Sequence, residues 1–122
     1  MNLEDLKVYQ LSMVIGDKVW DIVNSWDYFI KDTIGKQIVR SADSIAANIS
    51  EGFGRYHFKD SKKFLYYSRG SLYETKTWLT KAKNRNLISD KEYQYFESEI
   101  KNLGVKLNNY IKSIGNNTSQ MS

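Results

Sequence analysis

The sequence of 122 residues contains no cysteine and no proline, and its single histidine is His57. Without cysteine the chain has no disulfide scaffold, no thiolate metal site and no cysteine nucleophile. One imidazole is too few for most zinc centres. The chain also lacks an apolar run of the roughly 20 residues that a membrane span needs, and its acidic N-terminus is unlike a signal peptide. We therefore expect a cytoplasmic protein that does not bind a membrane.

The absence of proline leaves long segments free to be helical, and no window alternates apolar and polar residues as a strand does. The length fits one domain. Four amphipathic segments with short connections predict an all-α fold, an antiparallel up-down four-helix bundle. We expect this single domain to cover residues 1–115 and a frayed polar tail to cover residues 116–122.

Two helices are expected in the first half of the chain. The first covers residues 3–25 with Asn2 as its N-cap, and the second covers residues 32–51, or begins at Asp27, and is stopped by Gly52. The first helix carries two apolar seams, one more than a small bundle needs. The surplus seam is expected either to widen the core or to meet another subunit. The two seams are Leu6, Tyr9, Met13, Gly16, Trp20 and Val23, and Val8, Leu11, Ile15, Val19, Ile22 and Trp26.

Two more helices are expected in the second half. The third begins at Asp60 or Ser61 and ends near Asn84, and small residues in its seam let a neighbouring helix approach closely. Ser89 and Glu92 form a capping box at the start of the fourth. The expected seams of the last three helices are Ile34, Ile38, Ala42, Ile45 and Ile49; Leu65, Ser68, Leu72, Thr75, Leu79 and Ala82; and Tyr93, Phe96, Ile100, Leu103, Leu107, Tyr110 and Ile114.

The net charge of +4 is unevenly distributed along the chain. Residues 1–30 carry two basic and five acidic side chains, a net charge of −3, whereas residues 64–88 carry five basic and one acidic, a net charge of +4. Residues 31–63 carry seven basic and four acidic side chains, a net charge of +3, so the basic surplus falls in the middle of the chain. It favours a one-sided positive surface if that part of the chain packs as one piece. The alternative is that the surplus serves solubility.

A stripe of cations and tyrosines runs along the third helix. Spacings of 3 and 4 residues place its members on one side, next to the apolar seam. Lysine and arginine bind phosphates, and aromatic rings stack on unpaired bases, so the stripe predicts a polyanion-binding surface. The alternative is a solvated face whose tyrosines cover the edge of the core. The candidate nucleic-acid-binding residues are Lys62, Tyr66, Arg69, Tyr73, Lys76, Lys83 and Arg85, and Thr80 belongs to the same stripe.

The second helix carries a polar stripe of its own, which also has two interpretations. It is either a solvated face or a set of side chains that hydrogen-bond to a neighbouring subunit or a ligand, because serine and asparagine are mediocre helix formers. The stripe consists of Gln37, Arg40, Ser44, Asn48 and Glu51.

No constellation of residues indicates catalysis. His57 has no paired acid at a diagnostic spacing, and residues 51–55 lack the Lys-Ser/Thr ending of a phosphate-binding loop. The helices contain no Glu-x-x-His pair for a di-metal site. We therefore expect no enzymatic activity, no cofactor, no metal and no small-molecule substrate.

Several short motifs together carry a family resemblance. They are Leu6-Lys7-Val8-Tyr9-Gln10, Gln37-Ile38-Val39-Arg40-Ser41-Ala42, Ser44-Ile45, Asn48-Ile49-Ser50-Glu51-Gly52-Phe53-Gly54-Arg55 and Arg69-Gly70-Ser71-Leu72-Tyr73-Glu74. With these motifs the chain, from Leu3 to about Ile114, resembles the 23S rRNA-intervening-sequence protein family, which is similar to the accessory proteins of diversity-generating retroelements. The chain departs from the family pattern in having Val39-Arg40 in place of an Arg-Arg pair and Trp26-Asp27 in place of Phe-Pro.

The resemblance implies a non-enzymatic bundle that assembles into a homopentamer and binds nucleic acid. It also implies a structural role for six motif residues, a hydrogen-bonded and charge-paired network near the end of the bundle or between subunits. These residues are Arg40, Asn48, Glu51, Arg55, Arg69 and Glu74. The function that we expect is binding of RNA or DNA with low sequence specificity by a homo-oligomer with a basic face. The alternative is a scaffold for protein interactions with no nucleic-acid role.

Overall fold

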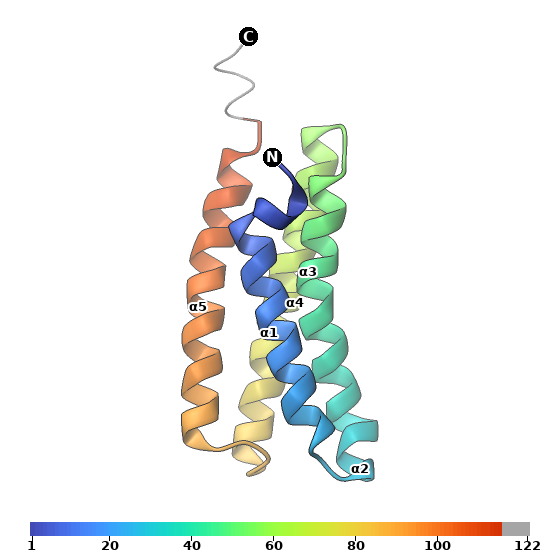
Figure 1. The fold of residues 1–122 in the computed structure, drawn as a ribbon, viewed down its shortest axis with the longest axis vertical. Coiled ribbons are helices and arrows are strands. Elements are labelled where there is room, and N and C mark those ends of the chain that lie inside the picture. Colours follow the sequence, from blue (N-terminus) through green and yellow to red (C-terminus); the bar gives the residue numbers. More distant parts are fainter. Residues whose placement is uncertain (116–122) are drawn as a thin grey trace.

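Four long helices lie side by side along one axis (Figure 1). This computed structural model describes residues 1–115, so the tail expected at residues 116–122 lies outside the described residues, and the domain boundary stays a prediction. The helices are α1 (Lys7–Asn24), α3 (Lys36–Phe53), α4 (Phe58–Asn84) and α5 (Asp90–Ser113). No strand occurs in residues 1–115, so the prediction of an all-α bundle is confirmed.

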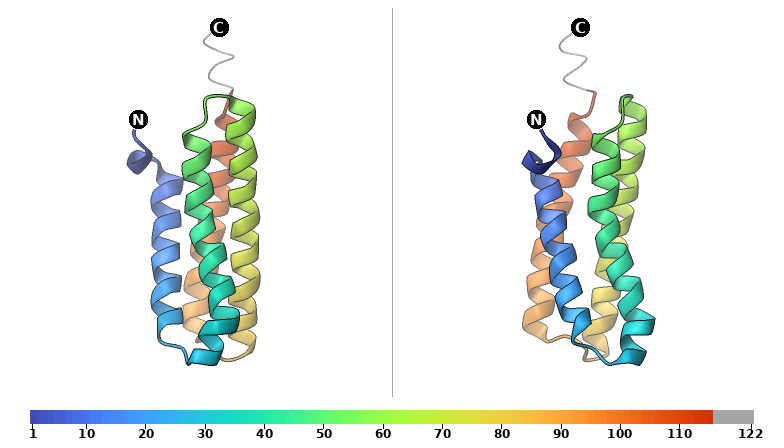
Figure 2. Two further views of the ribbon diagram at one scale, coloured as in Figure 1. Left: turned by 90° about the vertical axis from the view of Figure 1, so that its right-hand side faces the viewer. Right: turned by 45° about the vertical axis from the view of Figure 1, so that its right-hand side comes forward.

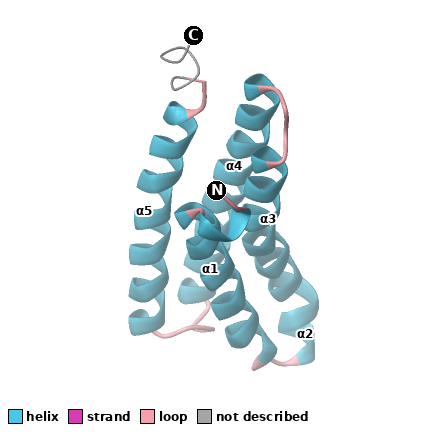
Figure 3. Cartoon of the chain, turned by 45° about the horizontal axis from the view of Figure 1, so that its top comes forward, coloured by secondary structure: helices cyan, strands magenta, loops and turns pink. Residues whose placement is uncertain are grey.

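Each long helix packs mainly against two of the other three. In Figure 1 the chain descends along α1, rises along α3, descends along α4 and rises along α5. α1 and α4 both pack against α3 and α5, so α1 and α4 lie diagonally opposite each other. Figure 2 shows the same rod from two more sides, and in Figure 3 the loops are confined to the ends of the long helices. Among residues 1–115, no helix combines the length and the apolar content that crossing a bilayer requires.

The first helix begins later than predicted. Leu3–Asp5 form a separate 3-10 turn, η1, in which the Asp5 carboxylate accepts a hydrogen bond of 3.1 Å from the Asn2 backbone N–H. Leu6 then takes an extended conformation, with φ −77° and ψ 118°, and its side chain is buried in the core. The bend between η1 and α1 therefore falls on a residue that packs into the core.

The two apolar seams of α1 are buried to different degrees. Val8, Ile15 and Val19 are buried, whereas Met13 and Trp20 of the other seam are 43% and 58% exposed. The surplus seam therefore adds Leu6 and Val23 to the core and leaves Met13 and Trp20 partly open to solvent.

The second predicted helix consists of three pieces. α2 (Tyr28–Ile30) follows Asp27, so the earlier of the two expected starts is correct. A π-helical turn, η2 (Lys31–Gly35), then leads into α3. A π turn adds one residue to a helical turn. Apolar residues spaced 3 to 4 apart do not distinguish a π turn from an α-helical turn. The seam from Ile34 to Ile49 is buried as predicted.

Gly52 does not stop the second helix. α3 continues to Phe53, and Gly52 lies buried inside it. A Cβ atom at this position would lie 3.0 Å from the Ser61 backbone oxygen, and the Ser61 hydroxyl donates a 2.5 Å hydrogen bond to the Gly52 carbonyl. Gly52 is therefore needed for the close approach of α3 and α4, not for a left-handed cap.

Small residues join α3 to α4, as the sequence predicts. The buried Ser68 hydroxyl donates to the Ile45 carbonyl over 2.8 Å, and the buried Thr75 hydroxyl donates to the Ser41 hydroxyl over 2.9 Å. α4 itself begins at Phe58, two residues before the earlier expected start, and ends at Asn84 as expected.

The fourth predicted helix is confirmed as α5, including its capping box. The Ser89 hydroxyl accepts from the Glu92 N–H over 3.0 Å, and the Glu92 carboxylate accepts from the Ser89 N–H over 2.8 Å. Its buried seam ends at Ile111, whereas Tyr110 and Ile114, which were expected in the seam, are half-buried.

Candidate nucleic-acid interface

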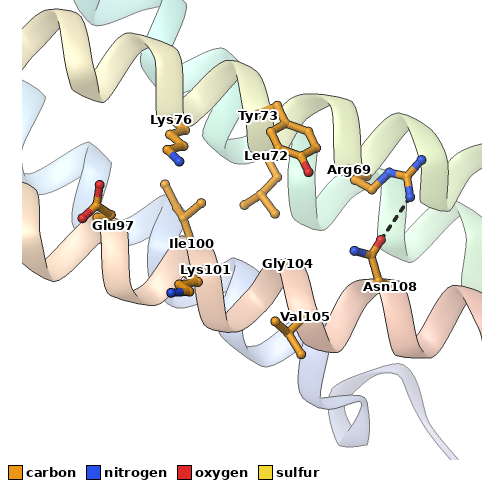
Figure 4. A pocket seen from close by; sticks show the side chains of 10 residues that line it. All are labelled: Arg69, Leu72, Tyr73, Lys76, Glu97, Ile100, Lys101, Gly104, Val105 and Asn108. Carbon is orange, nitrogen blue, oxygen red and sulfur yellow. Dashed lines mark hydrogen bonds between the residues drawn. The ribbon is translucent and has the colours of Figure 1, made fainter.

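An open groove of about 530 Å³ runs between α4 and α5 (Figure 4). Leu72, Ile100 and Gly104 contribute its apolar surface, and Figure 4 shows side chains from both helices along it. Its charged lining residues are Arg69 and Lys76 of α4 and Glu97 and Lys101 of α5, and its remaining members are Tyr73, Val105 and Asn108. Three cations and one carboxylate give the groove a positive balance.

Arg69 is the most constrained cation of the groove. Its guanidinium donates a 3.1 Å hydrogen bond to the Asn108 side-chain oxygen, which crosses from α4 to α5, and its Cζ lies 4.8 Å from the centre of the Tyr66 ring. The guanidinium has five N–H donors, and Asn108 accepts a hydrogen bond from one of them. Arg69 therefore retains donors for an anion. The guanidinium is thus held in place at one end of the groove.

A second cluster lies at the end of α4. The Thr80 and Tyr93 hydroxyls are 3.1 Å apart, and the Lys83 amine lies 4.7 Å from the centre of the Tyr93 ring. Tyr93 therefore holds two members of the predicted stripe against α5, in addition to the contact that Arg69 makes.

The structure separates the predicted stripe into exposed and half-buried members. Tyr66 and Tyr73 are 46% and 63% exposed, Lys76 is exposed, and Lys62, Arg69 and Lys83 are half-buried. Arg85 does not join the groove. It lines a separate depression between α3 and the end of α4, together with Trp78, Arg40 and other residues of the α3 side.

The groove residues that α5 supplies were not among the predicted binding residues. A row of polar residues lies beside the buried seam of α5. Its members, Glu97, Lys101 and Asn108, each follow a seam residue directly, namely Phe96, Ile100 and Leu107. The angular position of these residues around α5, next to its apolar seam, could have identified this row from the sequence. Which helix faces α4, however, is a property of the bundle and not of either sequence segment.

A different surface lies between α1 and α3. An apolar groove of about 420 Å³ is formed there, rimmed by cations of η2 and α3. Its members are Trp20, Val23, Asn24, Lys31, Gly35, Lys36, Val39 and Arg40. Asp32 pairs with Lys36 over 2.6 Å, and this hydrogen bond, followed by the charge of Asp32, raises the pKa of the Lys36 amine. Among the described residues, no three His, Cys, Asp or Glu side chains gather to hold a metal ion.

Comparison with known proteins identifies the family. The family model of the 23S rRNA-intervening sequence protein matches residues 4–109. The chain belongs to this family. A crystal structure of a protein of unknown function from the S23 ribosomal protein family of Bacteroides thetaiotaomicron VPI-5482 is similar, with a TM-score of 0.78 and 22% identity over 87% of this chain and 96% of that chain. This likeness shows the fold. No curated protein matches the chain.

The six motif residues of the 23S rRNA-intervening-sequence resemblance have separate partners and surroundings within the described subunit. Arg55 pairs with Glu51 over 3.0 Å near the α3–α4 loop, and its guanidinium lies 4.5 Å from the Phe64 ring centre. Glu74 accepts from the Trp78 indole N–H over 3.1 Å. The Asn48 amide donates to the Ser44 carbonyl over 2.9 Å, Arg40 lines the depressions beside α3, and Arg69 bonds to Asn108. A network that spans two subunits stays a prediction.

The polar stripe of α3 is partly satisfied by its own helix. The Ser44 hydroxyl donates to the Arg40 carbonyl over 2.7 Å, and Asn48 bonds to Ser44 as described above. Such bonds follow the i to i−4 pattern that serine and asparagine commonly form in helices. They account for these two side chains without a ligand.

Proposed function

We propose that this protein is a non-enzymatic homo-oligomer that binds RNA or DNA in the α4–α5 groove with low sequence specificity. The observation that carries the proposal is the placement of Arg69, Lys76 and Lys101 along one groove in which Glu97 is the single acidic lining residue. Fixed cations bind the phosphate backbone irrespective of sequence. Binding needs only such charges, so the proposal invokes no catalytic step.

The exposed apolar surface supports the oligomeric part of the proposal. Trp20 and Met13 lie on the α1–α3 side, away from the α4–α5 groove, and they remain exposed in the single subunit. Large exposed apolar patches are typical of protein–protein contacts. A subunit contact there leaves the basic groove free. The homopentamer, the cytoplasmic location and the similarity to retroelement accessory proteins, all implied at the level of sequence, are part of this proposal.

The second candidate function is a protein-interaction scaffold with no nucleic-acid role. The apolar α1–α3 groove favours it, because its lining contains Trp20, Val23 and Val39 and fits an apolar protein surface. In that case the cations of α4 and α5 serve only solubility. The protein then binds no nucleic acid, with or without these cations.

Fluorescence polarisation with labelled RNA, single-stranded and duplex, at several salt concentrations tests the proposal. The double substitution Lys76→Gln with Lys101→Gln is expected to weaken binding of both RNAs. The slope of log K against log salt should become shallower by about 1.4 for single strands and about 1.8 for duplex, the values for two lost phosphate contacts. The matched control is Lys7→Gln with Lys18→Gln, which removes the same charge from α1 and should change binding much less.

Two results would contradict the proposal. Absence of binding of either RNA even at low salt removes the nucleic-acid function and leaves the scaffold. Equal weakening by the α1 control and the groove variant shows that net charge, and not the groove, determines the interaction.

A further inference from the structure

The outer side of the first half of α4 carries three exposed tyrosines around a glycine. Tyr66, Tyr67 and Tyr73 are 46%, 51% and 63% exposed. Gly70 lies between them in the sequence, and at about 100° per residue all four positions fall on one side of the helix. We call these four residues the tyrosine platform. Of its members, only Tyr73 also lines the α4–α5 groove.

Packing within the subunit does not explain why residue 70 is a glycine. It lies in the middle of a 27-residue helix, where glycine is the least favourable residue after proline. A Cβ atom built at Gly70 would meet nothing within 4 Å. By contrast, Cβ atoms at Gly16 and Gly52 would come within 3.0 Å of a neighbouring helix. A bare backbone on an exposed helix face, at a cost in helix stability, indicates that something outside the subunit approaches it closely.

Cations accompany the rings of the platform. The Arg69 guanidinium lies 4.8 Å from the centre of the Tyr66 ring, and the Lys63 amine lies 6.0 Å from that of Tyr67. The nearby acid, Glu74, already accepts a hydrogen bond from Trp78. Exposed rings with positive charge beside them are the combination that single-stranded nucleic acids bind, because bases stack on the rings while phosphates meet the cations.

We propose that the tyrosine platform is a stacking surface for unpaired bases, so that the nucleic acid bound by this protein is single-stranded. This inference rests on the proposed function, since it assigns the class of nucleic acid to the same side of the molecule. A duplex buries its base faces in its own stack and offers a helix surface only phosphates and groove edges. Gly70 gives a base or a sugar room to lie flat between Tyr66, Tyr67 and Tyr73.

The experiment compares a labelled 20-nucleotide single-stranded RNA of mixed sequence with the duplex of the same length, by fluorescence polarisation at one low salt concentration. The natural protein is expected to bind the single strand at least about tenfold more tightly. Tyr67→Leu is expected to weaken single-strand binding about tenfold, the effect of losing one stacking ring, and Gly70→Leu at least as much. Both variants should leave duplex binding within about twofold, because neither residue lines the groove.

Two controls separate binding from folding. Gly70→Ala should raise the melting temperature by a few degrees, since it improves the helix and meets no neighbour, while weakening single-strand binding less than Gly70→Leu. Tyr28→Leu removes another exposed tyrosine, at the opposite end of the bundle, and should change binding of neither RNA.

Three results would overturn the inference. If both RNAs bind equally and Tyr67→Leu and Gly70→Leu change neither, while the Lys76 and Lys101 variant still weakens both, the platform has no role and the proposed function stands. If neither RNA binds, the proposed function fails together with the inference. If Gly70→Leu lowers the molar mass of the assembly in light scattering, a second copy of the chain covers the platform.

Discussion

At the scale of single residues, Gly16 and Asp43 show how closely α1 and α3 approach each other. A Cβ atom at Gly16 would lie 2.9 Å from the Asp43 carboxylate oxygen, so a larger residue there requires the Asp43 side chain to move. Burial raises the pKa of Asp43, and the charge of Asp17 raises it further. The charged carboxylate is therefore disfavoured in the folded protein relative to the unfolded chain.

This raised pKa predicts a pH-dependent stability. The folded state binds the Asp43 proton more tightly than the unfolded state, so the contribution of Asp43 is fully present below its ordinary pKa of 3.8 and is lost as pH rises through the folded-state pKa. Asp43→Asn mimics the protonated form and is expected to raise the urea midpoint at pH 7. This gain in midpoint should shrink as the pH approaches 3.8. Urea titrations at several pH values between 7 and 3.8 measure it.

The neighbouring acids of α1 provide the controls for this prediction. Asp17→Asn should act in the same direction by a smaller amount, because its charge is the second cause of the shift. Asp21→Asn changes an exposed acid on the same helix and should leave the midpoint unchanged. A loss of stability at pH 7 in Asp43→Asn would mean that the carboxylate makes a favourable interaction that outweighs its burial.

At the scale of helices, the α3–α4 pair depends on a glycine that the sequence pattern assigns to another role. Gly52 resembles a helix stop, yet it lies where the α3 backbone meets the Ser61 carbonyl. Gly52→Ala is expected to destabilise the protein by about 1–3 kcal/mol, because the added methyl group meets backbone that moves only with α4. Urea denaturation measures this loss as a lower midpoint at unchanged slope.

Gly54 offers a matched control two residues further along the chain. A Cβ atom there would have contacts of 3.7 and 3.8 Å, which are ordinary van der Waals distances, and its φ is −81°. Gly54→Ala should therefore change stability by less than about 0.5 kcal/mol. Equal effects of the two substitutions would show that loss of backbone freedom, and not the close approach of α3 and α4, determines the outcome.

The helices themselves were largely predictable, whereas their irregularities were not. Apolar repeats of 3 and 4 residues placed all four long helices, and the Ser89 and Glu92 box fixed the start of α5. The break at Leu6 and the π turn over residues 31–35, which holds the buried Ile34, occur where the chain packs against other helices. A local pattern does not contain those contacts.

At the scale of the molecule, the bundle separates two kinds of surface. The α4–α5 side carries the groove with Arg69, Lys76 and Lys101, and the α1–α3 side carries Trp20 beside an apolar groove. The α1–α3 groove also has cations on its rim from η2 and α3. In the proposed function these two sides serve different contacts, with nucleic acid on one and a second subunit on the other.

Trp20→Glu tests the assignment of the subunit contact. A carboxylate on the apolar seam of α1 is expected to reduce the molar mass of the proposed oligomer to that of smaller species, as measured by size exclusion with light scattering. Its fold should survive, because Trp20 is 58% exposed in the single subunit. Circular dichroism checks that point.

Val14→Glu is the matched control for the assembly. Val14 is an exposed apolar residue of the same helix that does not line the apolar α1–α3 groove, so its replacement should leave the molar mass unchanged. A natural protein that is monomeric at micromolar concentration would contradict the oligomeric part of the proposed function.

The sequence by itself determined that this chain forms helices, where they run, and that cations alternate with tyrosines along α4, because each of these is a property of residues close together in the chain. Only the tertiary structure decided that Lys101 and Asn108 of α5 lie along the same groove as Arg69, that Arg85 lies elsewhere, and that Trp20 stays exposed. These outcomes depend on which helix packs against which, and that choice is made by the joint burial of all four seams.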